Sequence, residues 1–244
     1  VTSLAYDEKN DFLFYTTDNS ANRDLYSYNL KNGQNTLLQK NFRSGDLAFN
    51  KKDQSLWAVM HMNGINTVIR IPKFNSENPN QYYSVWEQKY TLPYGHDIFD
   101  LDISPDGTRL SAAVADYFGN QYLNIYDLSS IDNLNKEDIK FDEVFNFEVA
   151  SPQTFKFTDD GKFLIGSSFY SGVSNIFRVD VETLEIEVMS NAITGYFRPL
   201  QIDSDRMFCF RYTSDGFAPV MIPNDPVDNV SSIEFLGNKT VQKH

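Results

Sequence analysis

The chain has 244 residues, of which 21 are Lys or Arg and 33 are Asp or Glu, giving a formal net charge of −12. Hydrophobic residues make up 41% and aromatic residues 15%, so material for a packed core is ample and intrinsic disorder of the bulk is excluded. The acidic charge argues against a nucleic-acid partner, because binding needs Lys and Arg to neutralise phosphates. It argues equally against adsorption to an anionic membrane. No apolar run approaches ~18 residues, so the sequence predicts no membrane insertion of this segment.

Short alternating strands, broken by Asn, Asp, Gly and Ser, fill most of the chain and predict an all-β fold. Five segments share one pattern, in which an apolar strand, a polar turn and a second apolar strand follow each other: 4–14, 47–57, 101–110, 155–164 and 200–208. A third strand follows each pair: 24–28, 67–71, 122–126, 175–179 and 218–222. Successive anchors are 43, 54, 54 and 45 residues apart when they are placed at Tyr6, Phe49, Ile103, Phe157 and Ile202.

A weaker fourth strand closes several units, for example at 83–86, 144–147 and 186–189, and 232–236 would close the fifth. Four antiparallel strands in each repeat of roughly 40–55 residues indicate the blade of a β-propeller. The predicted blades of this single domain span approximately 1–42, 43–94, 95–149, 150–195 and 196–238. Five blades fit either a closed five-bladed ring or part of a ring of six to eight. The only predicted helical turn is 131–138.

Two turns between the first and second strands carry a specific motif. Ile-Ser-Pro-Asp-Gly at 103–107 and Phe-Thr-Asp-Asp-Gly at 157–161 place Pro, Asp and Gly where a tight turn needs fixed or positive φ. Together with the third strands at 124–128 and 175–180, these motifs resemble the blade repeat of TolB-type propellers. That group is related to WD-type repeats and to the propellers of tricorn-like and prolyl-oligopeptidase-like proteins. The resemblance covers essentially the whole chain as a fold, and blades one, two and five lack the Pro-Asp-Gly element.

The resemblance implies a periplasmic or otherwise exported protein of a bacterial cell envelope. The strand-like start at Val1 is consistent with a processed chain or with an excised piece of a longer one. The low cysteine content fits the periplasm and the cytoplasm equally well. The single cysteine, Cys209, lies in an apolar run, and we predict that it is buried and unreactive.

No catalytic motif is present. The run 166–172 contains Gly and Ser but lacks the Gly-x-Ser-x-Gly spacing and the following helix of a nucleophile elbow. There is no phosphate-binding loop, no His-Glu-x-x-His and no pair of cysteines. His61 lies on a predicted second strand, where a structural role is expected. The sequence therefore favours a non-catalytic protein and predicts no cofactor.

The most site-like residues gather where the first strand of a blade begins. Asp46 lies three residues before the anchor Phe49, as Asp100 does before Ile103. Ligands of propellers usually bind where these strand entries converge. We therefore predict a polar ring at the mouth of the central channel, formed by Arg43, Asp46, His96, Asp97, Asp100 and Arg198. The alternative is that these side chains hydrogen-bond to the backbone of neighbouring blades; a metal held by His96 and two carboxylates is the least favoured reading.

Three functions stay open at this point. The first is a scaffold that binds a protein or peptide on the channel face, anchored by aromatic loops at 82–86 and 195–198. The second is the gating propeller of a larger serine peptidase. The third is a five-bladed carbohydrate-active enzyme, which would place carboxyls such as those of Asp46 and Asp100 ~5–10 Å apart across a pocket.

Overall fold

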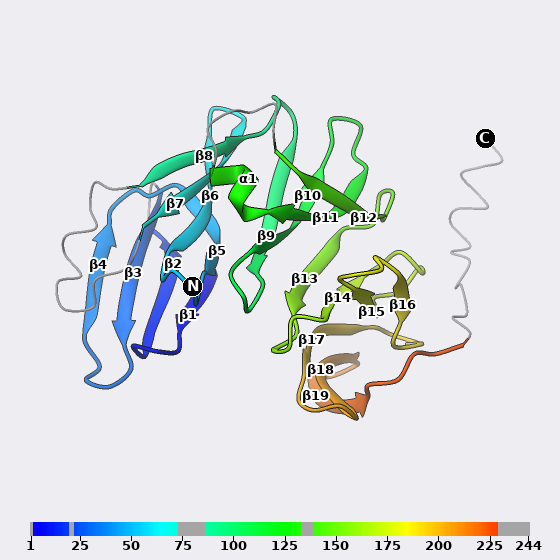
Figure 1. Cartoon of the computed structure of the whole chain (residues 1–244). Helices are drawn as coiled ribbons and strands as arrows, with labels where there is room; N and C mark the ends of the chain where they lie inside the picture. Colours follow the sequence, from blue (N-terminus) through cyan, green and yellow to red (C-terminus); the bar gives the residue numbers. More distant parts are fainter. Residues whose placement is uncertain (1, 20–21, 73–85, 133–138, 229–244) are drawn as a thin grey trace. The chain divides into compact units, whose positions relative to one another are not determined.

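The computed structural model describes residues 2–19, 22–72, 86–132 and 139–228 (Figure 1). These residues form nineteen strands and one short helix, and the strands make five separate antiparallel sheets. Four sheets have four strands and the last has three, with the strands of each sheet in chain order. This is the predicted all-β propeller architecture, with one sheet per blade.

The strands of each blade follow one another along the chain. Blade one contains β1 (Ser3–Asp7), β2 (Phe12–Asp18), β3 (Arg23–Asn29) and β4 (Asn35–Gln39). Blade two contains β5 (Ser44–Phe49), β6 (Leu56–Met62), β7 (Ile65–Ile71) and β8 (Glu87–Thr91). Blade three contains β9 (Asp97–Ile103), β10 (Arg109–Ala115), β11 (Gln121–Asp127) and β12 (Phe141–Asn146). Blade four contains β13 (Pro152–Phe157), β14 (Phe163–Ser168), β15 (Asn175–Asp180) and β16 (Ile186–Val188). Blade five contains β17 (Tyr196–Gln201), β18 (Arg206–Thr213) and β19 (Gly216–Pro223).

Several predicted boundaries shift. The helix α1 spans Leu128–Asp132, so it begins three residues before the predicted turn, and residues 133–138 lie outside the described residues. In blade two, the described fourth strand runs over Glu87–Thr91; of the predicted 83–86, residues 83–85 lie outside the described residues and Trp86 lies just before this strand. The predicted fourth strand of blade five, 232–236, lies outside the described residues.

The Asp-Gly turns form as predicted. Gly107 has φ 75° and donates its amide to the Ser104 carbonyl at 2.8 Å, and Gly161 has φ 70° and bonds to Thr158 in the same way. The hydroxyl of Ser104 donates to Asp106 at 2.6 Å, as that of Thr158 does to Asp160. The carboxylate therefore holds the turn from inside, which is the role that Asp has in such turns.

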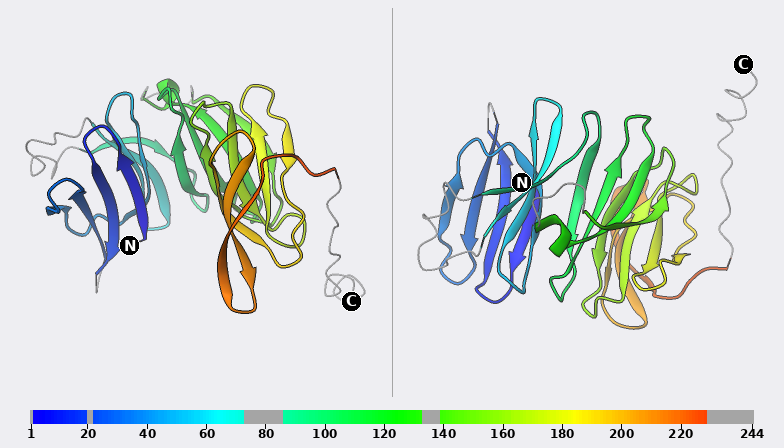
Figure 2. Two further views of the ribbon diagram at one scale, coloured as in Figure 1. Left: turned by 90° about the horizontal axis from the view of Figure 1, so that it is seen from below. Right: turned by 45° about the horizontal axis from the view of Figure 1, so that its top comes forward.

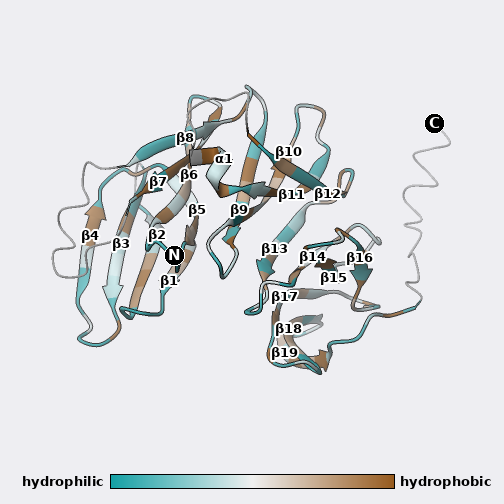
Figure 3. Ribbon diagram, viewed as in Figure 1, coloured by the Kyte–Doolittle hydropathy of each residue, from teal (hydrophilic) through white to brown (hydrophobic). Residues whose placement is uncertain are grey.

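The chain packs as two compact units, one of Val1–Phe118 with Asn124–Glu143 and the other of Gly119–Leu123 with Val144–His244. In the first unit, blades one and two bury a shared aliphatic and aromatic core, in which the rings of Phe14 and Phe49 stack 5.5 Å apart. In Figure 3 the hydrophobic segments lie mainly on strands, whereas many of the turns are hydrophilic. Burial of these apolar faces is the main force that holds the sheets together.

In the second unit, an aromatic cluster lies beside blade four. The ring of Phe147 contacts those of Phe155 and Phe177 at 5.8 and 5.7 Å. Phe155 packs so closely over Gly166 that a Cβ added there would overlap its ring. Within the described chain, no helix is long and apolar enough to cross a membrane.

Candidate functional site

Five of the six predicted site residues lie at one end of the first unit, where β1, β5 and β9 begin. This is called the entry end below. Arg43 and Asp46 belong to the start of blade two, and His96, Asp97 and Asp100 to the start of blade three. The sixth, Arg198, lies on β17 in the second unit.

A β-bulge interrupts the innermost strand in four of the five blades. Each bulge contains a non-glycine residue in the left-handed region, with φ between 50° and 53°: Asp46, Asp100, Thr154 and Arg198. Such a conformation costs free energy for a residue with a Cβ, so the surrounding structure must hold it in place. The structure therefore places Asp46, Asp100 and Arg198 at equivalent positions, as the spacing predicted for the first two. In blade five, however, the anchor is Gln201, which pairs with Met207 at the end of the strand, and not Ile202, because the following turn is shorter.

The carboxylate of Asp46 links blade two to blade three. It accepts a hydrogen bond from the backbone amide of Asp100, and its pKa is raised, chiefly by burial. Positive charge from Arg23 and the proximity of His61 oppose that increase in the pKa. Gly45 makes room for this arrangement, since a Cβ there would lie 2.6 Å from Nη1 of Arg23.

Blades one and two are joined by a similar bond. The Ser3 hydroxyl accepts a hydrogen bond from the backbone amide of Leu47 at 2.7 Å, beside the bulge residue Asp46. Ser3 and Asp46 therefore bond to the backbone of the next blade, as the alternative interpretation of the strand entries expects. Backbone groups that a bulge leaves unpaired are satisfied in this way.

Two histidines are connected through Asn66 at the entry end. Nδ1 of His61 and Oδ1 of Asn66 are 2.6 Å apart, and Nδ2 of Asn66 donates to the His96 carbonyl at 2.8 Å. The structural role expected for His61 is consistent with this bond. Nδ1 of His96 is buried and has no hydrogen-bond partner among the described residues.

The remaining two predicted residues differ in their surroundings. Asp97 accepts a hydrogen bond from the amide of Ile98 at 2.8 Å, within its own strand. Arg43 is exposed, with φ 53°, and its carbonyl accepts the amide of His61 at 3.1 Å. Its guanidinium is thus a cation that faces solvent at the entry end. Across the described residues, no group of three His, Cys, Asp or Glu side chains is arranged to hold a metal.

Exposed aromatic side chains surround the entry end, and the sequence argument missed them. Tyr94, Tyr117 and Phe118 are between 72% and 85% exposed. The ring of Tyr94 lies against Gly64, and that of Tyr117 against Gly95, where an added Cβ would meet each ring at 3.1 Å. The rings of Tyr117 and Phe118 make an edge contact at 5.4 Å. An aromatic residue directly before a loop glycine, as in Tyr94-Gly95 and Phe118-Gly119, is the signal that was available in the sequence.

The second unit has an aromatic cluster of its own where β17 begins. Phe197 contacts Phe169 at 5.8 Å and Phe217 at 5.2 Å, and Tyr212 contacts Phe217 at 5.4 Å. The predicted anchor segment 195–198 lies in this cluster. Of the other predicted segment, 82–86, only Trp86 is among the described residues, and it is exposed.

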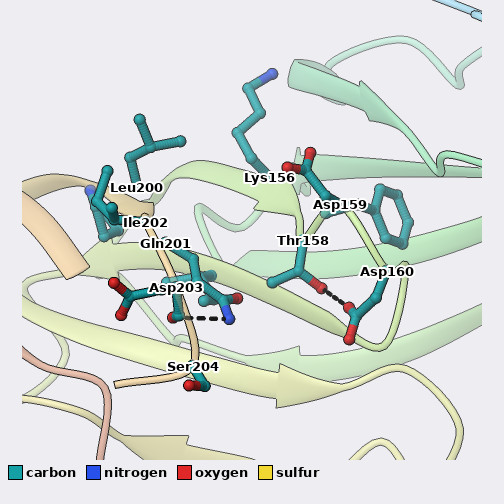
Figure 4. Close-up of a pocket in the computed structure, with 12 residues that line it drawn as sticks. Lys156, Thr158, Asp159, Asp160, Leu200, Gln201, Ile202, Asp203 and Ser204 are labelled. Atoms are coloured by element: carbon teal, nitrogen blue, oxygen red, sulfur yellow. Dashed lines mark hydrogen bonds between the residues drawn. The ribbon is translucent and has the colours of Figure 1, made fainter. Parts of the chain in front are cut away.

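A cavity lies at the opposite end of the inner strands, between the first turns of blades four and five (Figure 4). Its volume is about 260 Å³, and Lys156, Thr158 and Asp160 line one side. Gln201 lines the other and donates from Nε2 to the Asp203 carbonyl at 3.2 Å, whereas its Oε1 is buried without a partner. The carboxylates of Asp160 and Asp203 already accept hydrogen bonds within their own turns, so neither is available to bind a ligand in this cavity.

No family model matches the chain, and no curated protein matches it either. Several solved structures, however, match the chain. TolB from Acinetobacter baumannii is 15% identical with a TM-score of 0.61, and the match covers 92% of this chain and 54% of that one. TolB from Agrobacterium tumefaciens is 15% identical with a TM-score of 0.65, over 89% of this chain and 72% of that one. A puromycin-hydrolysing peptidase of Mycobacterium tuberculosis is 10% identical with a TM-score of 0.54, over 81% of this chain and 35% of that one.

The chain therefore spans about half of the length of the Acinetobacter protein. At sequence identities this low, the structural similarity establishes the fold alone and leaves the activity open. The five consecutive antiparallel sheets, their repeated bulges and these structural matches agree with the resemblance found in the sequence. The chain is a β-propeller of the TolB-like fold.

Proposed function

We propose that this chain is a non-catalytic binding module, which takes a protein or peptide partner at the entry end. The observation that carries the proposal is the exposed aromatic group of Tyr94, Tyr117 and Phe118. Exposed aromatic rings on rigid supports are typical anchors of protein interfaces, because they bury much apolar area at a small cost in side-chain entropy. Gly64 and Gly95 provide that support by lying directly beneath two of the rings.

The polar groups beside these rings suit a peptide backbone. Arg43 is exposed, and Nδ1 of His96 is a buried group that has no hydrogen-bond partner among the described residues. Interfaces usually combine an apolar centre with such orienting polar groups. Asp46 has a different role in this proposal, since its carboxylate bonds to the Asp100 amide and holds two blades together.

The contact between Asp46 and Asp100 gives no specific support to the carbohydrate-active enzyme, which needs two carboxyls on opposite sides of a pocket. The proposed location is the bacterial cell envelope, on the far side of the inner membrane. It rests on the resemblance to TolB-type propellers alone.

The test begins with a phage-displayed library of random linear dodecapeptides, panned against the chain. A selected peptide is then titrated calorimetrically against a variant with Tyr117→Ala and Phe118→Ala and against Phe141→Ala, which truncates an exposed ring on β12. We expect the double variant to weaken binding at least about tenfold and the control to leave it unchanged. Failure to enrich any peptide, or peptides that bind both variants equally, would overturn the proposal.

A second candidate follows from the match to the peptidase, of which this chain covers 35%. In this alternative, the propeller is the gating domain of a larger hydrolase. Its test is the reading frame beyond residue 244 and ahead of residue 1: a domain with a Ser-His-Asp arrangement supports the candidate, and a frame without one removes it.

A further inference from the structure

Asn66 on β7 connects three parts of the entry end. Its backbone carbonyl accepts the amide of Leu92 at 2.9 Å, and its side-chain Nδ2 donates to the carbonyl of His96 at 2.8 Å. These two bonds attach the loop that carries Tyr94 to blade two. The third bond joins Oδ1 of Asn66 to Nδ1 of His61, the residue directly opposite in the β6–β7 hairpin. In the right-hand view of Figure 2 the turn of this hairpin (cyan) stands at the upper end of blade two.

The orientation of the Asn66 amide determines which nitrogen of His61 carries a hydrogen. A backbone carbonyl can only accept, so the group that faces the His96 carbonyl must be the NH2 of Asn66. The amide oxygen therefore faces His61. Because this oxygen also can only accept, Nδ1 of His61 must be the donor across the 2.6 Å contact. A neutral imidazole has one N–H, which leaves a lone pair on Nε2 of His61.

This lone pair has no partner within the described chain. Nε2 of His61 is not buried, and it makes no hydrogen bond to the described residues. The side chain as a whole is half-buried, and its ring is close enough to Asp46 to oppose the rise in the pKa that burial causes in that carboxyl. A ring that is already held in place loses little freedom when a ligand donates to it. Nε2 of His61 is therefore an oriented acceptor.

A residue that supplies donors lies beside this acceptor. The amide of His61 donates to the Arg43 carbonyl at 3.1 Å, so the two residues are neighbours on adjoining segments. Arg43 is exposed, and a guanidinium offers donors alone. Each main-chain unit of a peptide, except at proline, has one donor and one acceptor. An extended peptide is therefore the ligand whose groups match Arg43 and His61 together.

We propose that His61 is a specificity-determining residue of the entry end, whose Nε2 accepts a main-chain N–H of the bound peptide, and that Asn66 is the positioning residue that holds the required tautomer. This inference rests on the proposed function, because it concerns the same surface and the same partner. It adds a selection rule: a site built to accept an N–H rejects a ligand that lacks it. Peptides with proline or an N-methylated residue at the contacted position should therefore bind poorly.

The tautomer is tested without any ligand. The histidine rings are labelled with 15N, and a long-range proton–nitrogen correlation spectrum is recorded at pH 8; the signals of His61 are those lost in His61→Asn. We expect a protonated Nδ1 and an unprotonated Nε2. Asn66→Asp, which retains an oxygen facing Nδ1, should keep this tautomer, whereas Asn66→Ala should increase the population of the other one. A hydrogen on Nε2 in the wild type would overturn the inference, and an unchanged tautomer in Asn66→Ala would overturn the role of Asn66.

The contact is tested with a dodecapeptide selected on the wild-type chain and titrated calorimetrically. The side chain in His61→Asn reaches the position of Nδ1 and can still bond to Asn66, but it has no atom at the position of Nε2. We expect this variant to weaken binding at least about tenfold. His61→Gln, whose amide reaches the position of Nε2, should recover part of that loss. Phe141→Ala is again the control, with the affinity of the wild type, and circular dichroism checks that each variant is folded.

N-methylation of the peptide, one amide at a time, identifies the donor. At one position it should weaken binding to the wild type at least about tenfold but binding to His61→Asn at most about twofold, because the contact is already absent there. Acetylation of the peptide N-terminus should have no effect, and a loss of binding would identify the terminal ammonium as the donor and overturn the main-chain contact.

Two further results separate this inference from the proposed function. Equal losses in both proteins at every N-methylated position, or an unchanged affinity of His61→Asn, would overturn the inference alone, provided that Tyr117→Ala with Phe118→Ala still weakens binding. Failure to enrich any peptide would overturn the proposed function, and the contact to His61 with it.

Discussion

The carboxylate of Asp46 accepts a hydrogen bond from the backbone amide of Asp100, which lies 54 residues further along the chain at the equivalent bulge of the next blade. The bulges at Asp46 and Asp100 free backbone groups from the ladders of their own sheets, and in each case a side chain of the preceding blade satisfies one of these groups. Ser3 does the same for Leu47. These two bulges therefore provide hydrogen bonds between neighbouring blades, in addition to distorting their own strands.

Two substitutions of Asp46 distinguish the effect of its hydrogen bond on stability from the effect of its charge. Asp46→Ala leaves the Asp100 amide without its acceptor and should lower the free energy of unfolding by about 1–3 kcal/mol. Asp46→Asn keeps a carbonyl oxygen and removes a charge that burial disfavours, so its free energy of unfolding at pH 7 should equal or exceed that of the wild type. Urea denaturation of both variants at pH 7 provides the measurement.

The pH dependence follows from the raised pKa of Asp46. Below the ordinary Asp pKa, near 3.9, the carboxyl is neutral in both states and burial costs nothing. As the pH rises from there through the folded-state pKa, the charged form penalises the folded state, so wild-type stability decreases relative to Asp46→Asn. A difference between the two proteins that grew as the pH fell would contradict this assignment.

Gly166 is the position at which a methyl group should be least tolerated. In Gly166→Ala the new Cβ would overlap the ring of Phe155, which is buried against Phe147. Overpacking of this kind should cost about 1–3 kcal/mol of stability. Gly45→Ala is the matched control, because its nearest neighbour is the flexible guanidinium end of Arg23. Thermal melting should therefore separate the two variants, and equal losses would contradict the packing described for Phe155.

The buried indole N–H of Trp57 donates its hydrogen bond to a single side-chain hydroxyl, that of Ser55. Its Nε1 donates to the Ser55 hydroxyl at 2.8 Å, and that hydroxyl donates to Asp53 at 2.6 Å. Ser55→Ala leaves a buried N–H unsatisfied and should lower the free energy of unfolding by about 1–3 kcal/mol. Ser55→Thr retains the hydroxyl and tests whether the bond, and not the residue volume, is responsible; guanidinium denaturation is the measurement. A loss in Ser55→Thr as large as in Ser55→Ala would count against the bond.

Cys209 should be inert in the folded protein. Burial raises the pKa of its thiol to about 11, and the thiolate is the reactive species. Alkylation by iodoacetamide at pH 8 should therefore proceed only through transiently unfolded molecules, at a rate set by their small population, and denaturant should accelerate it strongly. Because the unfolded thiol ionises near pH 8.5, the wild type should also lose stability relative to Cys209→Ala as the pH rises from there towards 11. Rapid alkylation of the native protein would contradict the buried position.

The sequence was sufficient for the fold because a propeller is a repeat. The Asp-Gly turns at 104–107 and 158–161 and the regular anchors predict the sheets. The spacing also places Asp46 and Asp100 at equivalent positions, although it did not predict that a bulge lies there. A hydrophobic alternation of period two is a local property, so it can be read from the chain directly. The prediction that Cys209 is buried is confirmed for the same reason.

The site was less accessible to such reasoning. Spacing brings Asp46 and Asp100 to equivalent positions, but it does not tell a ligand-binding carboxylate from one that bonds to the next blade. The aromatic residues at the entry end escaped notice because Tyr94 and Tyr117 lie in loops, where no periodicity exists. Their contacts with Gly64 and Gly95 depend on how separate loops approach each other, which is a tertiary property.

The central claim, that a partner docks at the entry end, is tested most directly by hydrogen–deuterium exchange with and without a saturating amount of a peptide selected as described above. The account predicts slower exchange in the loops 92–98 and 114–120 and no change in the turns 158–161 and 201–205 of the second unit. Protection confined to those turns, or no protection near Tyr94 and Tyr117, would contradict it.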